Sequence, residues 1–217
     1  MKSRVLLLAL ALACASRAAA ATTVFTDATA FAAALSGTQS TLNFDSAAVG
    51  GISGSEFSSQ GFVFASPAGL ALEVAPPSGF APSNYLNIGE RPFQGGIDNN
   101  NDSLDITIVG DWSAAAFSFI DGAVPANASE SITFYGNGGN VLYTRTSGAV
   151  SFIGIVTDQP IRRALVSEAA NDGDDLGYDN FVLGNPVLSA VPEPEMYAMF
   201  MAGLALFGCV AKRRQAV

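Results

Sequence analysis

Apolar and polar residues alternate with a period of two along most of this chain. The segment LDITI (104–108) alternates Leu and Ile with Asp and Thr, and AFSFID (116–121) alternates Phe with Ser. A strand with this pattern places one face in a core and the other toward solvent. The same reading predicts further strands at 40–45, 61–66, 70–74, 131–135, 140–146, 150–157, 161–168 and 178–184.

Clusters of Gly, Asn, Asp and Pro separate these runs. The clearest is YGNGGN (135–140), which predicts a hairpin between 131–135 and 140–144. Many short strands at close spacing, with turn signals between them, are typical of an all-β domain. The sequence therefore predicts an antiparallel β-sandwich or barrel.

Two segments do not follow the strand pattern. An apolar stripe at helical spacing begins after Asp27, which can cap a short helix, and runs to Leu35, after which Gly37 can end it. The stretch 75–103 is rich in Pro, Gly and Asn. It is either one long loop, of the kind that often carries function, or two loops on either side of a short strand at 84–89, which we favour.

Residues 1–21 have the composition of a secretory signal peptide. Two cations precede an unbroken apolar run, and small residues follow up to Ala21. This order predicts cleavage after Ala20 or Ala21. Two alternatives are a buried N-terminal helix and a lipoprotein signal at Cys14, in which Ala11 stands where a lipobox usually has Leu.

The C-terminal end carries a second apolar run at 196–211. A helix of 16 residues rises roughly 24 Å, against a hydrocarbon core of about 30 Å, so this run is marginal as a permanent membrane span. The cations Lys212, Arg213 and Arg214 follow at once, which places this end in the cytoplasm by the positive-inside rule. The body between the two ends then faces outward.

The body is strongly acidic. From Thr22 to Ala190 it holds 17 acidic and 4 basic residues, a net charge of −13. Such a surface repels nucleic acid, and it suits solubility, calcium or a hydrated polymer. The cysteines, Cys14 and Cys209, both lie outside the body, so the body folds without disulfides.

The body lacks the residue types that most catalytic mechanisms need. The body has no His, Cys or Lys, so we expect neither a nucleophilic triad nor a zinc site, and the chain has no phosphate-binding or dinucleotide motif. A carboxylate pair, as in glycosidases, is the remaining option. Nothing in their spacing marks a pair among the glutamates of the body, which are Glu56, Glu73, Glu90, Glu130 and Glu168.

Oxygen-rich metal binding has more support. The segments IDNNND (97–102) and NDGDDLGYDN (171–180) concentrate Asp and Asn, whose oxygens suit Ca²⁺. Asp172, Asp174 and Asp175 would repel one another without a counter-ion. The alternative is that Asp and Asn are simply good turn residues, and neither segment has the pattern of an EF-hand.

The C-terminal end resembles a known sorting signal. Val191, Pro192, Glu193 and Pro194 precede the apolar run, and the three cations 212–214 follow it, in the order of a PEP-CTERM tail. The resemblance implies that an exosortase in the membrane recognises the tail and cleaves near Pro-Glu-Pro. It also implies transient insertion in the inner membrane and a bacterium that makes extracellular polysaccharide.

The body is similar to the jelly-roll-like bodies of many PEP-CTERM proteins. The similarity lies in NFD (43–45), AFSFID (116–121), YGNGGNVLYT (135–144) and the long segment 152–184. Such sandwiches resemble carbohydrate-binding modules, some of which hold a structural calcium near the first and last strands. Here that implies Asp45 and Asp179 as ligands, although fold analogy supplies no activity.

Together these features predict four parts of the chain: a signal peptide at 1–21, a β-sandwich domain at 22–184, a linker at 185–190 and a sorting tail at 191–217. The favoured function is a non-enzymatic protein, exported through the inner membrane to the cell surface or extracellular matrix. A carbohydrate-binding module that contacts exopolysaccharide is the alternative, and a hydrolase is the third hypothesis. The aromatic residues in or beside irregular loops, which could stack on sugars, are Phe80, Tyr85, Phe93 and Trp112.

Overall fold

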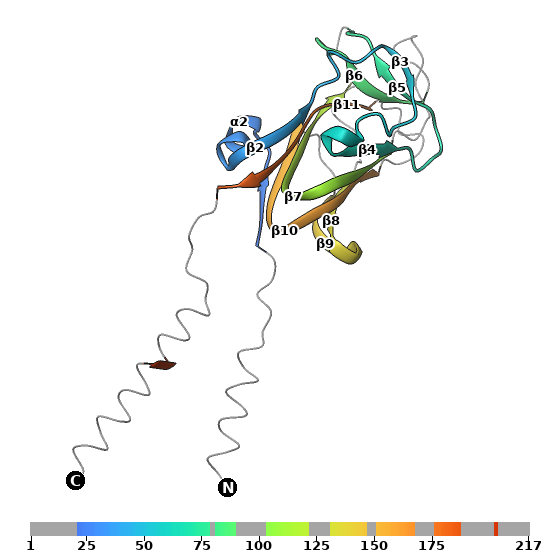
Figure 1. Ribbon diagram of the computed structural model, residues 1–217. Coiled ribbons are helices and arrows are strands. Elements are labelled where there is room, and N and C mark those ends of the chain that lie inside the picture. The colour runs from blue at the N-terminus through green and yellow to red at the C-terminus, as the bar shows by residue number, and fades with distance from the viewer. Residues whose placement is uncertain are drawn as a thin grey trace, which may run out of the picture. The chain divides into compact units, whose positions relative to one another are not determined.

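A computed structural model describes residues 21–78, 81–89, 103–121, 131–146, 151–167, 176–187 and 202–203 (Figure 1). Most of these residues lie in strands. The strands are β1 (Thr22–Phe25), β2 (Leu35–Leu42), β3 (Gly50–Ile52), β4 (Phe62–Ala65), β5 (Leu72–Ala75), β6 (Tyr85–Ile88), β7 (Leu104–Asp121), β8 (Ser131–Gly136), β9 (Val141–Thr146), β10 (Phe152–Ser167) and β11 (Leu176–Pro186). The helical segments within residues 21–187 as described are α2 (Ala28–Ala33) and two 3₁₀ turns, η1 (Ser58–Gln60) and η2 (Asn137–Gly139).

The strands form one hydrogen-bonded sheet. Its order is β3-β5-β6-β11-β7-β10-β8-β9, with β1 paired to β10, β2 to β11 and β4 to β7, and these pairs are antiparallel. The prediction of an all-β, antiparallel fold is confirmed. The sequence suggested a sandwich, whereas the described strands are joined in a single sheet.

The sheet stays continuous because β7 and β10 are long and irregular. The sequence predicted two strands in each, but the structure joins them across a bend. The pairing register of β10 on β7 shifts between Val156 and Ile161, and Gly110 of β7 has φ = 104°. A bulge of this kind bends a strand without ending it. Arg162 fastens the bend by donating to the Gly110 carbonyl and to Asp111.

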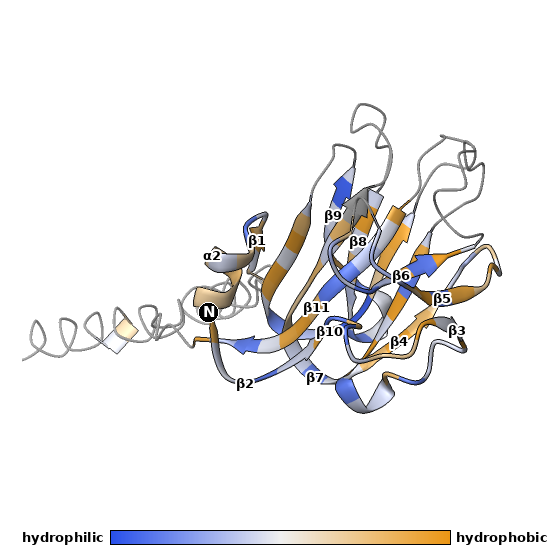
Figure 2. Cartoon of the chain, turned by 90° about the horizontal axis from the view of Figure 1, so that it is seen from above, coloured by the Kyte–Doolittle hydropathy of each residue, from blue (hydrophilic) through white to orange (hydrophobic). Residues whose placement is uncertain are grey.

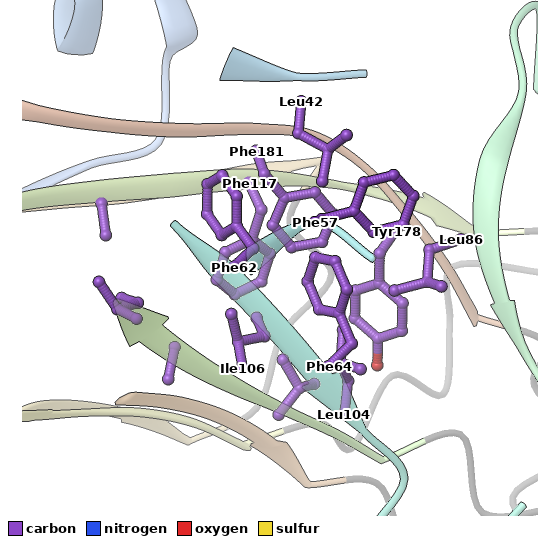
Figure 3. Packing of buried hydrophobic residues seen from close by; sticks show 14 of the residues in the cluster. Leu42, Phe57, Phe62, Phe64, Leu86, Leu104, Ile106, Phe117, Tyr178 and Phe181 are labelled. Atoms are coloured by element: carbon purple, nitrogen blue, oxygen red, sulfur yellow. The ribbon is translucent and has the colours of Figure 1, made fainter. Parts of the chain in front are cut away.

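The main core joins residues from both sides of this bend (Figure 3). The ring centroid of Phe181 in β11 lies 5.5 Å from that of Phe62 and 4.9 Å from that of Phe64, both in β4. The Phe117 ring of β7 lies 5.6 Å from the same Phe181 ring. Figure 2 shows hydrophobic and hydrophilic residues alternating along the strands, which is the pattern from which the core was predicted.

A second cluster lies where α2 packs on the sheet. Asp27 caps the helix as predicted, since its Oδ1 accepts from the Ala30 amide at 2.7 Å. The prediction that the helix runs to Leu35 is wrong, because α2 ends at Ala33 and Leu35 pairs with Pro186 as the first residue of β2. Phe31 and Leu35 still serve the same apolar cluster, which also contains Ala114, Ala116 and Phe152.

Other local predictions can be compared with the strands. The YGNGGN hairpin is confirmed, because β8 pairs with β9 and the Gly136 amide donates to the Asn140 carbonyl at 2.8 Å. The short strand expected at 84–89 is β6. Sequence reading missed β1 and β3, which are short and offer few alternating positions.

The contacts within the chain divide it after Pro186 into two units. The second unit, from Val187 to Val217, is described at Val187, Ala202 and Gly203. The predicted signal helix within 1–20 and most of the apolar run at 196–211 lie outside the described residues. Within the described parts, no helix combines the length and apolar character that crossing a membrane requires.

Candidate functional site

Two of the carboxylates implied as calcium ligands occur in neighbouring parts of the fold. Asp179 lies in β11 and is 2% exposed. Burial raises the pKa of its carboxyl group, and the negative charge of Asp45 raises that pKa further. Hydrogen bonds from Asn180 and Ser83 act in the opposite direction. A buried carboxylate beside a second carboxylate is the kind of environment that a bound cation stabilises.

Asp179 is held by donors from two segments. Its Oδ1 accepts from the backbone amide of Asn180 at 2.7 Å, and its Oδ2 accepts from the Ser83 hydroxyl at 3.0 Å. The side-chain amide of Asn180 also donates to Oδ2, at 3.2 Å. These bonds fix the carboxylate: two donors occupy the lone pairs of Oδ2, and one lone pair remains on Oδ1.

Unusual backbone conformations place the two aspartates. Phe44 and Asn180 adopt the left-handed region, with φ of 55° and 53°. This region is rare for a residue such as Phe, and here the Phe44 side chain is 1% exposed in the core, with its ring 5.8 Å from that of Phe181. Asp45 follows directly and is exposed, and its Oδ2 accepts from the Asn43 side chain at 2.9 Å. The buried phenylalanine therefore anchors the turn that carries Asp45.

A third segment joins these two just before β6. The Asn84 side chain donates to the carbonyls of Phe44 and Ala47, at 3.3 and 3.5 Å. We define the Asp45–Asp179 corner as the residues of the three segments that meet here, namely Asn43, Asp45, Ser83, Asn84, Asp179 and Asn180. Sequence reasoning named the two aspartates, included Asn180 within the Asp- and Asn-rich segment 171–180, and missed Ser83 and Asn84.

The corner offers oxygen atoms and no softer ligand. Carboxylate, amide and hydroxyl oxygens are the atoms that Ca²⁺ prefers. The described residues contain no group of three or more His, Cys, Asp or Glu side chains able to hold a metal ion. Asp172, Asp174 and Asp175, the other predicted ligands, lie outside the described residues.

The predicted sugar-stacking residues have different positions. Tyr85 is 2% exposed and clusters with Ala75 and Ala81, so its ring is not available to stack on a sugar, and we remove it from the candidates. Trp112 is partly buried against the core, and its Nε1 donates to the Val109 carbonyl at 3.1 Å. Phe80 and Phe93 lie outside the described residues.

Of the glutamates, Glu56 has the clearest surroundings. Its Oε1 accepts from the Ser53 amide at 2.8 Å and from the Ser53 hydroxyl at 3.0 Å. The backbone amide of Ser53 lowers the pKa of this carboxyl, which suits an ionised turn residue better than a proton donor. Glu73 lies in β5 opposite Asn87, while Glu90, Glu130 and Glu168 lie outside the described residues.

The residues of the sorting motif also lie outside the described part of the chain: Val191, Pro192, Glu193, Pro194, Lys212, Arg213 and Arg214. Sequence comparison addresses them directly. Residues 190–215 match the family model described as the PEP-CTERM protein-sorting motif. The predicted tail is therefore confirmed, and the chain carries a C-terminal sorting signal of exported proteins that implies processing by exosortase. No curated protein matches the chain.

Solved structures resemble the body at low sequence identity. The cleaved adhesin domain of Lys-gingipain from Porphyromonas gingivalis is 16% identical, covers 70% of this chain and all (100%) of its own, and has a TM-score of 0.46. A family 29 carbohydrate-binding module from Piromyces equi is 9% identical, with 70% and 93% of the two chains covered and a TM-score of 0.31. A variant family 29 module in complex with mannohexaose is 12% identical, with 69% and 92% covered and a TM-score of 0.32.

Proposed function

We propose that this protein is exported through the inner membrane, cut by an exosortase near Pro192–Pro194, and retained at the cell surface or in the extracellular matrix of a polysaccharide-producing bacterium. It acts there without catalysis. The observation that carries the proposal is the match of residues 190–215 to the PEP-CTERM protein-sorting motif. In this proposal residues 1–21 are a signal peptide, 185–190 link the body to the tail, and the body is a jelly-roll-like domain.

Several properties of the body support a structural role in a hydrated matrix. Its net charge of −13 favours solubility and repels other polyanions, so contacts with an acidic polymer would need cations as bridges. The His, Cys and Lys side chains that most nucleophilic and metal-assisted reactions use do not occur between Thr22 and Ala190. Among the candidate sugar contacts, Tyr85 is buried and Trp112 is engaged at the bend of the sheet.

The first prediction is that the mature protein lacks both ends. Intact mass of the protein from the native host should fit a chain that begins near Ala21 or Thr22 and ends near Pro192–Glu195. Deletion of the host's exosortase gene should leave residues up to Val217 in place, because the proposal assigns removal of the tail to exosortase. Recovery of mostly tail-bearing protein from wild-type cells would contradict sorting by exosortase.

We further propose that the Asp45–Asp179 corner binds a structural calcium ion. The supporting observation is that Asp179, a residue only 2% exposed, lies close enough to Asp45 for the charge of Asp45 to raise the pKa of its carboxyl group. The corner thus places two acidic side chains near each other. The ion would gain two carboxylates and nearby amide or hydroxyl oxygens as ligands. It would neutralise the negative charges of these two carboxylates and would link the turn at Asp45 to β11.

The second prediction follows from this site. Millimolar Ca²⁺ should raise the thermal midpoint of chelator-treated protein by several degrees. A site at 100 times its dissociation constant contributes about 2.7 kcal/mol, and 1 kcal/mol moves the midpoint of such a domain by roughly 2–4 °C. Asp45→Asn and Asp179→Asn should remove the rise, measured by differential scanning calorimetry. Asp27→Asn is the matched control, because it removes an acidic charge at the cap of α2 while Asn remains a good cap.

The pH dependence of the thermal midpoint distinguishes stabilisation by a bound ion from the effect of the metal-free carboxylates. Because the folded-state pKa of Asp179 is raised, the metal-free folded protein binds this proton more tightly than the unfolded chain does. The contribution of Asp179 to metal-free stability should therefore increase as pH falls through the folded-state pKa, whereas the rise caused by Ca²⁺ should shrink over the same window. A midpoint unaffected by Ca²⁺ at neutral pH would leave a hydrogen-bonded turn as the role of these residues.

A further inference from the structure

The first strand of the body begins directly after the predicted signal peptide. β1 starts at Thr22 and pairs with the first half of β10, with Thr22 opposite Thr157. The Thr22 hydroxyl also donates to the Leu142 carbonyl of β9, at 3.4 Å. Thr22 is the first residue after a cut behind Ala21 and the second after a cut behind Ala20, so either cut leaves β1 whole and its new N-terminus beside β10.

The carboxylate of Asp158 lies next to the residue that precedes β1. The backbone nitrogen of Ala21 donates to Oδ2 of Asp158 over 3.3 Å, and both residues are exposed. Asp158 lies where β10 leaves its regular pairing on β7, between Val156 and Ile161, so the bend of the strand presents it toward the start of β1.

Asp158 has no cation of its own in the described part of the chain. The two neighbouring arginines of β10 are used elsewhere, since Arg162 pairs with Asp111 and Arg163 pairs with Asp105. Within the described residues, the hydrogen bond to the Asp158 carboxylate comes from the Ala21 amide. A positive charge on that nitrogen would turn a neutral donor into a charge-assisted one, which is about twice as strong.

Signal-peptide cleavage can supply this charge at one of the two sites that the sequence allows. Hydrolysis after Ala20 adds water across the Ala20–Ala21 peptide bond, leaving a carboxylate on Ala20 and an α-ammonium on Ala21. Hydrolysis after Ala21 removes the nitrogen that faces Asp158. We propose that the cut falls between Ala20 and Ala21, and that Asp158 binds the new α-ammonium and so holds β1 on β10.

This inference rests on the proposed export, and two measurements test its two parts. N-terminal sequencing and intact mass of protein from the native host should give Ala21 as the first residue. Thr22 as the first residue would overturn the cleavage site. Retention of residues 1–20 would overturn both the cleavage and the proposed export.

The ion pair is tested separately, on a chain from Ala21 to Val217 released from a fusion and kept in mild detergent. Asp158→Asn should lower its thermal midpoint by about 1–3 °C at low salt, as expected for an exposed ion pair, and by less at about 1 M salt. A second pair of proteins, with Asp or Asn at position 158, carries one extra Gly before Ala21. The Gly moves the ammonium by about 3.8 Å while the amide of Ala21 stays in place. In this pair Asp158→Asn should lower the thermal midpoint by less. Equal decreases in both pairs, or none in either, would overturn the role of Asp158 whatever the fate of the signal peptide.

Discussion

At the scale of single residues, small side chains determine how closely α2 can approach the sheet. Phe31 is 1% exposed, and it packs over Gly154 of β10 and Ala116 of β7. A Cβ at position 154 would come within 2.6 Å of the Phe31 ring and 3.0 Å of the Ala116 Cβ. Real Cβ contacts are almost never as short as 2.6 Å, so the absence of a side chain at Gly154 is what allows the helix to dock.

The third prediction concerns this contact. Gly154→Ala should lower the free energy of unfolding by about 1–3 kcal/mol, which is the usual cost of overpacking a filled site. Urea unfolding followed by fluorescence would measure it. Gly51→Ala is the matched control, because its added Cβ would lie 3.9 Å from its nearest neighbour, the Leu72 carbonyl oxygen, and it should change stability by less than about 0.5 kcal/mol. Equal effects at both positions would show that strand entropy, and not the contact with Phe31, governs Gly154.

At the scale of elements, alternation predicted where the strands lie but not where they join. The segments 104–108 and 116–121 read as separate strands because the period of two is lost across VGDWS (109–113), where Gly110 takes a positive φ. The structure carries β7 through this segment, since β10 shifts register opposite it. A pattern within one strand cannot reveal a bulge that depends on the partner strand.

In the helix and in the candidate site, too, the sequence predicted features that depend on neighbouring residues but not those that depend on contacts far along the chain. Asp27 was recognisable as a cap from its neighbours alone, whereas the early end of α2 depends on the pairing of Leu35 with Pro186, far along the chain. Asp45 and Asp179 came from a family resemblance. Ser83 and Asn84 could not be found from the sequence, because their roles depend on contacts with Asp179 and Phe44 across many residues.

At the scale of the whole molecule, the chain separates a folded body from a sorting tail. Internal contacts divide the chain after Pro186, four residues before the matched sorting motif begins at 190. The last strand of the body extends up to this division, where Asn185 and Pro186 pair with Ser36 and Leu35 of β2. A protease that cuts near Pro192–Pro194 would therefore leave every strand of the described sheet intact.

The last prediction tests this separation. A chain from Ala21 to Pro186 should unfold at the same temperature as the chain from Ala21 to Val217, both in the same mild detergent, because the body keeps its strands and its apolar clusters. A chain that ends at Leu183 is the matched control. It loses the pairing of Gly184 with Ala114 and the two pairs that β11 makes with the start of β2, so its midpoint should fall by several degrees. Calorimetry of the three proteins decides the matter. A decrease of more than about 4 °C in the chain that ends at Pro186 would mean that the tail contributes at least about 1 kcal/mol to the body, and that exosortase cleavage would release a weakened domain.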